Sequence, residues 1–512
     1  MDLSLISLEI GVALIGVIVL LVDLWTPEAH KKRLGWLVVI GLVGAFAFEL
    51  KNSGHLHGDD TMGFQRDSLT IFFHGFFIMA GIMVTLLTIS YADRIRRSIG
   101  ELYALICFAL TGMLFAAGST SFVMLFVSVE LVTITFYILT SFEAHRLRSL
   151  EAGVKYLILG AASSGVMVFG IALIYGSTGE LGYTAISQAI RDLDATEFGN
   201  LFLFSTGIVL VLAGLAFKVA AVPFQLWVPD VYQGAPTPVT AFLSAGSKAA
   251  GFVLLIRMVV LHEDVVHSWA KPEFVEQLPI INMQTLLAVM AGATILYGSL
   301  CALRQRNLKR LLGYSSIASA GYALLGVVAL NAEGIEAVLY YLAGYLFAVL
   351  AAFTIIAMVT DDAEDEDISV LANLHQRSPL FAVTLTLAIV SMAGIPPLAG
   401  FFGKFLLLKS AMGVMDQNPV LPWVVGIAIV GVVISLYYYF GVIREIYWGS
   451  GRFWAGDEEK PKTAPIECPD TADIIVMICV FWLLALGLYP EPVMSVVQDA
   501  ALGLFASELP SP

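Results

Sequence analysis

The feature that most constrains this chain is a succession of long apolar runs along nearly its whole length. A helix needs about 20 mostly apolar residues to cross a bilayer, and about fourteen segments reach that length. Composition agrees, since 58% of the 512 residues are hydrophobic and only 13% are charged, about half the charged fraction of a soluble domain. We therefore predict an all-α polytopic membrane protein with about fourteen transmembrane helices near residues 3–25, 34–50, 68–90, 99–118, 119–142, 151–176, 199–230, 236–261, 281–303, 308–330, 334–360, 378–412, 420–444 and 470–492.

The distribution of lysine and arginine predicts the orientation of these helices. With the N-terminus outside, the inner loops hold 17 of these residues and the outer loops hold 4. Because basic residues accumulate in cytoplasmic loops, we expect both termini outside a bacterial inner membrane. The first apolar run is followed by the basic residues Lys31, Lys32 and Arg33 and not by a small-residue cleavage pattern. We therefore expect a retained helix rather than a signal peptide.

Charge and cysteine content argue against several classes of protein. The net charge of −14 lies mostly in loops, as in the acidic run 361–367, and does not indicate binding to nucleic acid. The four cysteines are scattered without a C-x-x-C spacing, so neither a disulfide framework nor a zinc or iron–sulfur site is indicated. No glycine-rich nucleotide motif is present, and we expect no cofactor site in this chain.

Two short patterns repeat at nearly the same offset. The pattern of residues 151–157 recurs at 336–342, and that of 214–218 recurs at 400–404, which are offsets of 185 and 186 residues. The offset spans five predicted helices, and an odd number reverses direction in the membrane. We therefore expect two inverted five-helix repeats, a common plan in transporters. The expected divisions are 1–98 with three N-terminal helices, 99–262 with the first repeat, 281–449 with the second, and 450–512 with a cytoplasmic loop, the last helix and the tail.

Each repeat is expected to contain a broken helix. Segments 199–230 and 378–412 each exceed 30 residues. Prolines inside them, Pro223 and Pro229 in the first and Pro396 and Pro397 in the second, interrupt helical hydrogen bonding. Freed backbone groups at membrane depth are tolerated only inside protein or around water. The breaks lie within a few turns of Lys218 and Lys404, so each is expected to place a hydrated cavity beside a titratable amine.

Lys309, Arg310 and Arg444 lie at the ends of spans and are counted with the inner loops. Six other basic residues fall within the predicted spans. A charge at the centre of a spanning helix costs about 2.5–3.5 kcal/mol, so each such residue requires a partner, water or a function. Burial favours the neutral amine, whereas a nearby carboxylate favours the charged one. A buried lysine can therefore exchange protons, whereas an arginine cannot. The six residues are Lys155, Lys218, Lys248, Arg257, Lys404 and Lys409.

Five side chains are the candidates for a proton path. Glu130 lies in the middle of its span without a basic neighbour in sequence, and we expect it either to modulate the proton affinity of Lys218 or to form a static ion pair. Lys218 precedes the first break, and Lys248, among small residues and serines, is expected to be a relay. Lys404 is expected to be the terminal donor near the outer exit. Lys155 is expected either to take part or to snorkel toward the interface.

Three further residues have weaker indications. Arg257 and Lys409 lie toward the outer ends of their spans, where snorkelling is expected. His74 could titrate near neutral pH, but a lone membrane histidine is more often a hydrogen-bonded structural group. The loop 234–238 leads into a helix. Conformational coupling is one interpretation of this loop among others.

Three stretches of this sequence, 217–238, 308–317 and 394–404, resemble the antiporter-like membrane subunits of respiratory complex I, the proton-pumping NADH-quinone oxidoreductase. The resemblance extends over nearly the whole chain. Within that family the chain is most similar to the subunit N branch, called subunit 2 in mitochondria. The indications are residues 230–234, a lysine at 248, and a lysine at 404 where the related M branch typically has glutamate.

The resemblance implies a proton-translocating subunit of a translocase that carries no redox centre itself. Glu130, Lys218, Lys248 and Lys404 match the charged set of the family. It further implies antiporter-like and small membrane subunits as partners, within the bilayer. FMN, iron–sulfur clusters and quinone would belong to the rest of the complex. A proton would enter from the inside, pass between Lys218 and Lys248 to Lys404, and leave outward.

Two alternatives remain open from the sequence. A multisubunit sodium/proton antiporter shares most of these motifs, although the stretch at 230–234 favours subunit N. A membrane scaffold that transports nothing is the other, but six basic residues within the spans are difficult to explain in that way.

Overall fold

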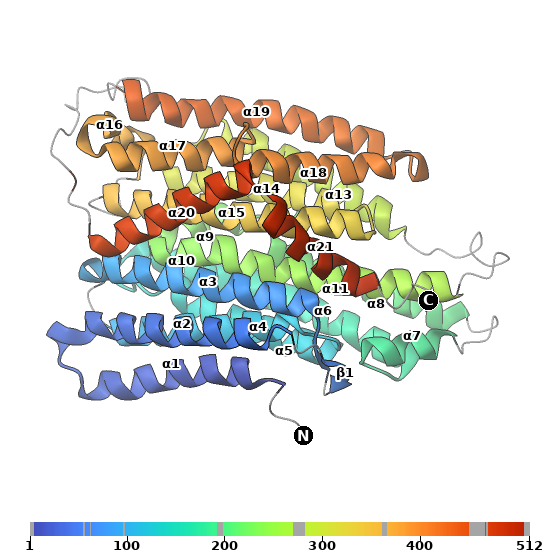
Figure 1. Ribbon diagram of the computed structural model, residues 1–512. Helices are drawn as coiled ribbons and strands as arrows, with labels where there is room; N and C mark the ends of the chain where they lie inside the picture. The colour runs from blue at the N-terminus through green and yellow to red at the C-terminus, as the bar shows by residue number, and fades with distance from the viewer. Residues whose placement is uncertain are drawn as a thin grey trace.

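The computed structural model describes residues 5–54, 57–61, 63–95, 98–191, 198–269, 282–360, 366–449, 466 and 469–505. Its helices run roughly along one direction and form an elongated bundle (Figure 1). Twelve of them are long and apolar enough to cross a membrane. The helices that correspond to the predicted spans are α1 (Ser7–Trp25), α2 (Leu34–Asn52), α3 (Ser68–Tyr91), α4 (Ile99–Ala117), α5 (Phe122–Thr140), α6 (Leu147–Thr178), α8 (Phe198–Val219) with α9 (Val228–Gly234), α10 (Thr237–Phe242) with α11 (Lys248–Trp269), α13 (Met283–Ala302), α14 (Leu308–Val327), α15 (Ala332–Val359), α17 (Pro379–Ala393) with α18 (Ala399–Gly413), α19 (Leu421–Trp448) and α20 (Asp470–Leu488).

Every predicted span therefore contains helix, and the prediction of a helical polytopic membrane protein is confirmed. Two spans are not among the twelve most apolar helices: α14, which contains several serines and glycines, and α17–α18, which is divided by its break. The all-helical description has one small exception, an antiparallel pair of short strands, β1 (His57–Thr61) and β2 (Phe64–Arg66).

Several short elements at the ends of the bundle were not anticipated from the sequence. Those longer than five residues are the turn η1 (Glu28–Arg33) and the helices α7 (Tyr183–Arg191) and α21 (Glu491–Phe505). The turn η1 lies at one end of the bundle, which we call the η1 end. The N-terminus, β1, α7 and the end of α21 lie toward the other, which we call the terminal end (Figure 1). The remaining short elements are η2 (Ala92–Arg94), η4 (Ile368–Leu371), α16 (Leu374–Arg377) and η5 (Met415–Gln417).

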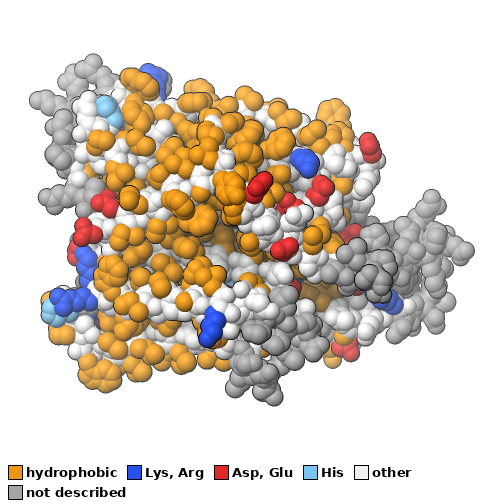
Figure 2. Space-filling model, in the orientation of Figure 1, with side chains coloured by type: hydrophobic (Ala, Val, Ile, Leu, Met, Phe, Trp, Pro, Cys, Tyr) orange, Lys and Arg blue, Asp and Glu red, His pale blue; other side chains and the backbone are white. Residues whose placement is uncertain are grey.

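The interior of the bundle is formed mainly by α15 and by the continuous α10–α11 span, which are buried along almost their whole length. Helix α15 packs against α10, α14, α17, α18, α20 and α21. Hydrophobic side chains cover much of the outer face in Figure 2, and lysine and arginine gather beside η1. An apolar wall around a helical core that contains charged residues is the arrangement expected of a protein in a bilayer.

Both predicted helix breaks are present. Helix α8 ends at Val219 and α9 begins at Val228, whereas α17 ends at Ala393 and α18 begins at Ala399. Side chains satisfy backbone donors at both sites: Thr294 accepts from the nitrogen of Val222 at 2.9 Å, and Ser391 accepts from the nitrogen of Gly400 at 3.1 Å. A third irregularity, the π-helical turn η3 (Leu243–Ser247), joins α10 to α11 and was not anticipated.

Some predictions concern residues outside the described part of the chain. These are the acidic residues 361–365, the basic residues Arg96, Arg97, Lys271, Arg452, Lys460 and Lys462, and Cys468.

Candidate functional site

Lys218 is the first of three buried lysines beside helix irregularities. It lies in the last turn of α8, directly before the first break, and only 5% of its surface is exposed. Its ammonium nitrogen donates to the hydroxyl of Thr133 on α5. The amine is therefore held by a neutral acceptor in an apolar interior.

Glu130 lies one helical turn before Thr133 on α5 and interacts electrostatically with Lys218. Its carboxylate accepts a hydrogen bond from Ser164 on α6. Within the described residues no ion pair closer than 4.0 Å joins Glu130 to Lys218. The structure thus brings the expected pair into the same region, with Thr133 rather than the carboxylate in contact with the amine.

Lys248 follows the π-helical turn and is also buried, with 4% exposed. Its nitrogen donates to the carbonyl oxygen of Ser316 on α14 at 2.6 Å and also to the hydroxyl of Ser316. That hydroxyl lies 3.0 Å from the hydroxyl of Tyr232, and the ring of Tyr345 lies 5.6 Å from the amine. Ser244 contacts the hydroxyl of Tyr345 at 3.2 Å. Hydroxyl groups therefore surround this second amine.

Lys404 lies on α18, after the second break, and is 6% exposed. Its nitrogen donates to the carbonyl oxygens of Met392 and Ala393, at 2.8 and 3.3 Å. These carbonyls end α17, where the last helical carbonyls have no partner in their own helix. The ring of Tyr322 lies 4.8 Å from the amine, close enough for a cation–π contact. The break thus supplies the acceptors for Lys404.

Hydroxyl side chains occupy the region between Lys248 and Lys404. On α14, Ser315, Ser316, Ser319 and Tyr322 recur at a spacing that places them on neighbouring faces of one helix. Ser315 shares a hydrogen bond with Tyr439 on α19. Among the described residues, no carboxylate or histidine lies within ion-pair distance of either amine. These hydroxyls were not predicted from the sequence, although the spacing of serines on α14 was a visible signal.

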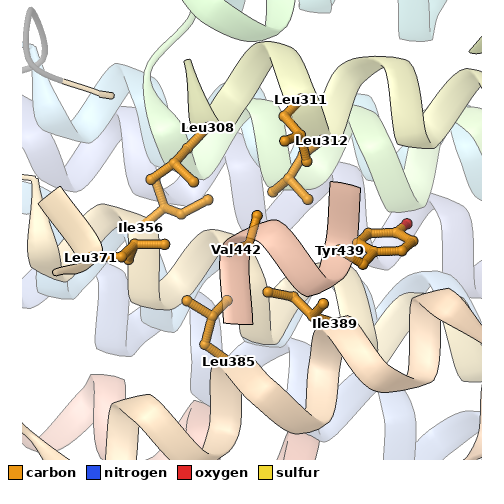
Figure 3. Close-up of a pocket in the computed structure, with 9 residues that line it drawn as sticks. All are labelled: Leu308, Leu311, Leu312, Ile356, Leu371, Leu385, Ile389, Tyr439 and Val442. Atoms are coloured by element: carbon orange, nitrogen blue, oxygen red, sulfur yellow. The ribbon is translucent and has the colours of Figure 1, made fainter. Parts of the chain in front are cut away.

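Figure 3 shows a small cavity on the η1 side of this hydroxyl region, lined by Tyr439 and by aliphatic side chains from α14, α15, η4, α17 and α19. The aliphatic residues are Leu308, Leu311, Leu312, Ile356, Leu371, Leu385, Ile389 and Val442. Such a lining offers water no hydrogen-bonding partners except at Tyr439. The lining of this cavity is therefore unsuited to hold a chain of water molecules.

Lys155 differs from the three buried lysines. Its side chain is 41% exposed and pairs with Glu151 and with Asp230, both at 2.6 Å. Asp230 on α9 also pairs with Arg310 on α14. The cluster thus links α6, α9 and α14, and it places Lys155 in an exposed ion-pair network apart from the other candidates.

Arg257 was expected to snorkel, and this prediction is wrong. The residue is buried, with its guanidinium nitrogens 2.9 and 3.0 Å from the carboxylate of Asp67 and 2.7 Å from the carbonyl oxygen of Ala117. Burial acts against ionisation of Asp67, but Arg257 holds the pKa of that carboxyl below its ordinary value of 3.8. The partner lies 190 residues away in sequence, so no local pattern indicated it. Lys409, in contrast, is exposed as expected.

His74 is fully buried near the terminal end of α3, between Glu9 of α1 and Glu49 of α2. Glu9 and Glu49 are thus buried glutamates of the helical bundle, whereas Glu130 is only half-buried. Neither Glu9 nor Glu49 was identified from the sequence as a candidate.

The comparisons with known proteins agree with this arrangement. A family model described as NADH:quinone oxidoreductase/Mrp antiporter, TM, matches residues 119–435. The NADH-quinone oxidoreductase subunit N of Desulfitobacterium hafniense is 37% identical over 98% of this chain and 99% of that protein. The chain belongs to the subunit N family of NADH-quinone oxidoreductases. The subunit N of Heliobacterium modesticaldum is 36% identical, over 99% of this chain and the full length of that protein.

A solved structure shares the fold of this subunit N family member. A chain of respiratory complex I from Thermus thermophilus with bound aureothin is 29% identical and superposes with a TM-score of 0.76, over 96% of this chain and 99% of that one. The family model alone covers both NADH:quinone oxidoreductases and Mrp antiporters. The full-length relatives resolve that ambiguity in favour of subunit N.

Proposed function

We propose that this chain translocates protons as a membrane subunit of an NADH-quinone oxidoreductase, with Glu130, Lys218, Lys248 and Lys404 as the proton-carrying residues. One observation carries the proposal: each of the three lysines is buried beside an interruption of regular helix, and each contacts neutral acceptors. Membership of the subunit N family supports it.

The proposed path begins at the η1 end, which we assign to the inside of a bacterial cell membrane. A proton reaches Lys218 near the first break, passes to Lys248, continues to Lys404 and leaves at the terminal end. In this proposal, the apolar lining of the cavity in Figure 3 disfavours entry of a proton from the inside between α14, α17 and α19. Entry through the first half and exit through the second half is therefore the favoured direction.

Glu130 is the proposed regulator of Lys218. In the structure Glu130 accepts from Ser164, and Lys218 donates to Thr133. A shift that brings the carboxylate into contact with the amine would stabilise the ammonium, and its return would favour release of the proton. A hundredfold change in proton affinity is worth about 2.7 kcal/mol, similar to the roughly 2.3 kcal/mol needed to move one charge against 100 mV.

The hydroxyl side chains of α14 are proposed to connect Lys248 to Lys404. A hydroxyl both donates and accepts hydrogen bonds, so with intervening water it can hold a chain of hydrogen bonds along which a proton moves. Ser316 contacts Lys248, and Tyr322 faces Lys404. Together they mark the two ends of this connection.

The remaining parts of the proposal concern the setting of the chain. We expect other antiporter-like and small membrane subunits as neighbours, with FMN, iron–sulfur clusters and quinone elsewhere in the complex. Residues 1–98, 99–262, 281–449 and 450–512 are proposed as N-terminal unit, first repeat, inverted second repeat and C-terminal part, with both termini outside. Lys155 is proposed to assist entry by holding Asp230 and thereby α9.

Replacement of Lys218 by Met in the whole complex tests the proposal. NADH oxidation and proton uptake are measured together in inverted membrane vesicles. We expect fewer protons moved per NADH oxidised in an assembled complex, because methionine fills the space but binds no proton. Lys409→Met, which removes an exposed lysine, is the matched control and should pump normally. Full pumping by the Lys218 variant would refute the assignment.

The Mrp part of the family model's description supports one second candidate, a subunit of a sodium/proton antiporter. Sodium-dependent proton movement in vesicles without NADH would favour that function. If Lys218, Lys248 and Lys404 could all be replaced without any effect on transport, the chain would instead be a scaffold.

A further inference from the structure

Four ionisable side chains meet at the terminal end of the first three helices, away from the lysine path. The ring of His74 lies between two carboxylates: Glu9 at 3.2 Å from Nε2 and Glu49 at 3.3 Å from Nδ1. Arg66 of β2 lies 3.0 Å from the second carboxylate oxygen of Glu49. We call these four residues the N-terminal cluster. All are buried, and Glu9 and His74 have no exposed surface.

Glu9 is the least satisfied member of the cluster. Apart from the 3.2 Å approach to His74, neither of its carboxylate oxygens has a hydrogen-bond partner among the described side chains and backbone. Burial of an ionised carboxylate without hydrogen bonds is costly. Its charge must therefore be balanced by a proton, either on the imidazole that faces it or on the carboxyl group itself.

No other charge competes for His74 in the described structure. From α4 the ring meets only the carbonyl oxygen of Leu114, at 3.3 Å. The adjacent Asp67 is engaged by Arg257 in its own ion pair. Helices α10, α15, α20 and α21, which also pack on α3, bring no described acidic or basic side chain within ion-pair distance of the ring. The charge of the cluster is therefore set by its own four members.

Counting these charges defines the number of mobile protons. Two carboxylates face one guanidinium that is always protonated, so the cluster is electrically neutral only when it holds one more proton. We propose that Glu9, His74 and Glu49 form a proton-binding site that holds one exchangeable proton, distinct from the lysine path. Because a carboxylate lies on each side of the imidazole, the proton can reside on the imidazole or on a carboxyl group.

The position of the cluster connects this proton to the rest of the bundle. Helix α3 packs against α10 and against the π-helical turn that precedes Lys248. A change of charge on His74 therefore acts on a helix in contact with the lysine path. The site also joins three helices, because its members come from α1, α2 and α3.

Infrared difference spectra of the purified complex, recorded between neutral and alkaline pH, test the site directly. In the native complex we expect one group of the cluster to lose a proton as the pH is raised. Glu9→Gln removes one negative charge, so the cluster becomes neutral with an uncharged imidazole, and this titration should disappear. Glu101→Gln removes an exposed glutamate of α4 and is the matched control, which should leave the titration unchanged.

In contrast to Glu9→Gln, His74→Gln is expected to keep a titrating proton. Two carboxylates and one guanidinium remain, so one carboxyl must keep the proton, and the titrating signal should move from imidazole to carboxyl bands. If Glu9→Gln does not assemble, the difference between the native complex and His74→Gln, recorded with isotopically labelled histidine, decides the question. Identical spectra for all variants would show a static ion cluster and overturn the proposal. Because the readout is protonation and not pumping, it is independent of the test at Lys218.

Discussion

Replacement of Ser316 by Ala is the sharpest test of the hydroxyl connection, because it removes one hydroxyl and leaves the backbone carbonyl that also binds Lys248. A hydrogen bond to a charged group contributes about 1.5–3 kcal/mol, and one between neutral groups about 0.5–1.5 kcal/mol. Loss of the hydroxyl therefore disfavours the ammonium over the neutral amine by about 1 kcal/mol. That corresponds to a roughly fivefold lower affinity of Lys248 for its proton.

The assay is proton pumping per NADH oxidised across a range of pH. A relay with lower proton affinity is empty more often at alkaline pH, so we expect pumping by Ser316→Ala to fall there about fivefold and to recover as the pH is lowered. Ser410→Ala, which removes a buried hydroxyl that bonds only within α18, is the control. Pumping that equals the native value at every pH would refute the reasoning. A fall by the same factor at every pH would show that the hydroxyl connection was broken without a change in the proton affinity of Lys248.

Two further predictions concern stability and helix geometry. Asp67→Asn leaves the buried Arg257 without its charged partner, and we expect about 3 kcal/mol of destabilisation, measured as lower thermal stability of the complex. Because the folded pKa of Asp67 lies below the ordinary value of 3.8, this stabilisation is complete above that value and is lost as the pH falls through the folded pKa, so the native and variant complexes should converge in acid. Gly400→Ala would place a methyl carbon 1.8 Å from the carbonyl oxygen of Ser391, so we expect loss of assembly or of pumping, whereas Gly413→Ala, where nothing lies within 4 Å, should behave as the native protein.

The sequence was sufficient for features that depend on local composition. Apolar runs of sufficient length located every spanning helix, and prolines in the two overlong runs located both breaks. Lysines within apolar runs must lie inside the protein because lipid does not solvate them, so the burial of Lys218, Lys248 and Lys404 was also predictable.

Contacts between helices distant in sequence were not predictable in this way. Arg257 pairs with Asp67 across 190 residues, and Lys248 meets Ser316 across 68. The N-terminal cluster depends on the packing of α1, α2 and α3, which brings together residues from the ends of three separate runs. A single sequence gives the periodicity of each helix but not which faces meet.

Lys309 shows how a lysine with a structural role differs from the three lysines proposed to transfer protons. Lys309 was counted from the sequence as a loop residue, yet it is almost fully buried and lies 2.7 Å from the equally buried carboxylate of Glu366. It also donates to the carbonyl oxygen of Ala235 at 2.9 Å. Separation of a buried ion pair leaves an uncompensated charge at a cost of about 3–5 kcal/mol, so this pair fixes the position of Lys309, which holds the loop between α9 and α10.

A lysine that transfers protons requires the opposite environment. Carbonyl and hydroxyl oxygens accept from an ammonium, and they leave no bare charge behind when the amine becomes neutral. Lys248 and Lys404 have only such partners among the described residues, and Lys218 has Thr133, with Glu130 nearby but not in contact. The charged and neutral forms of these amines can therefore lie within a few kcal/mol of each other. The identity of the acceptor, more than burial alone, separates the three proposed carriers from Lys309.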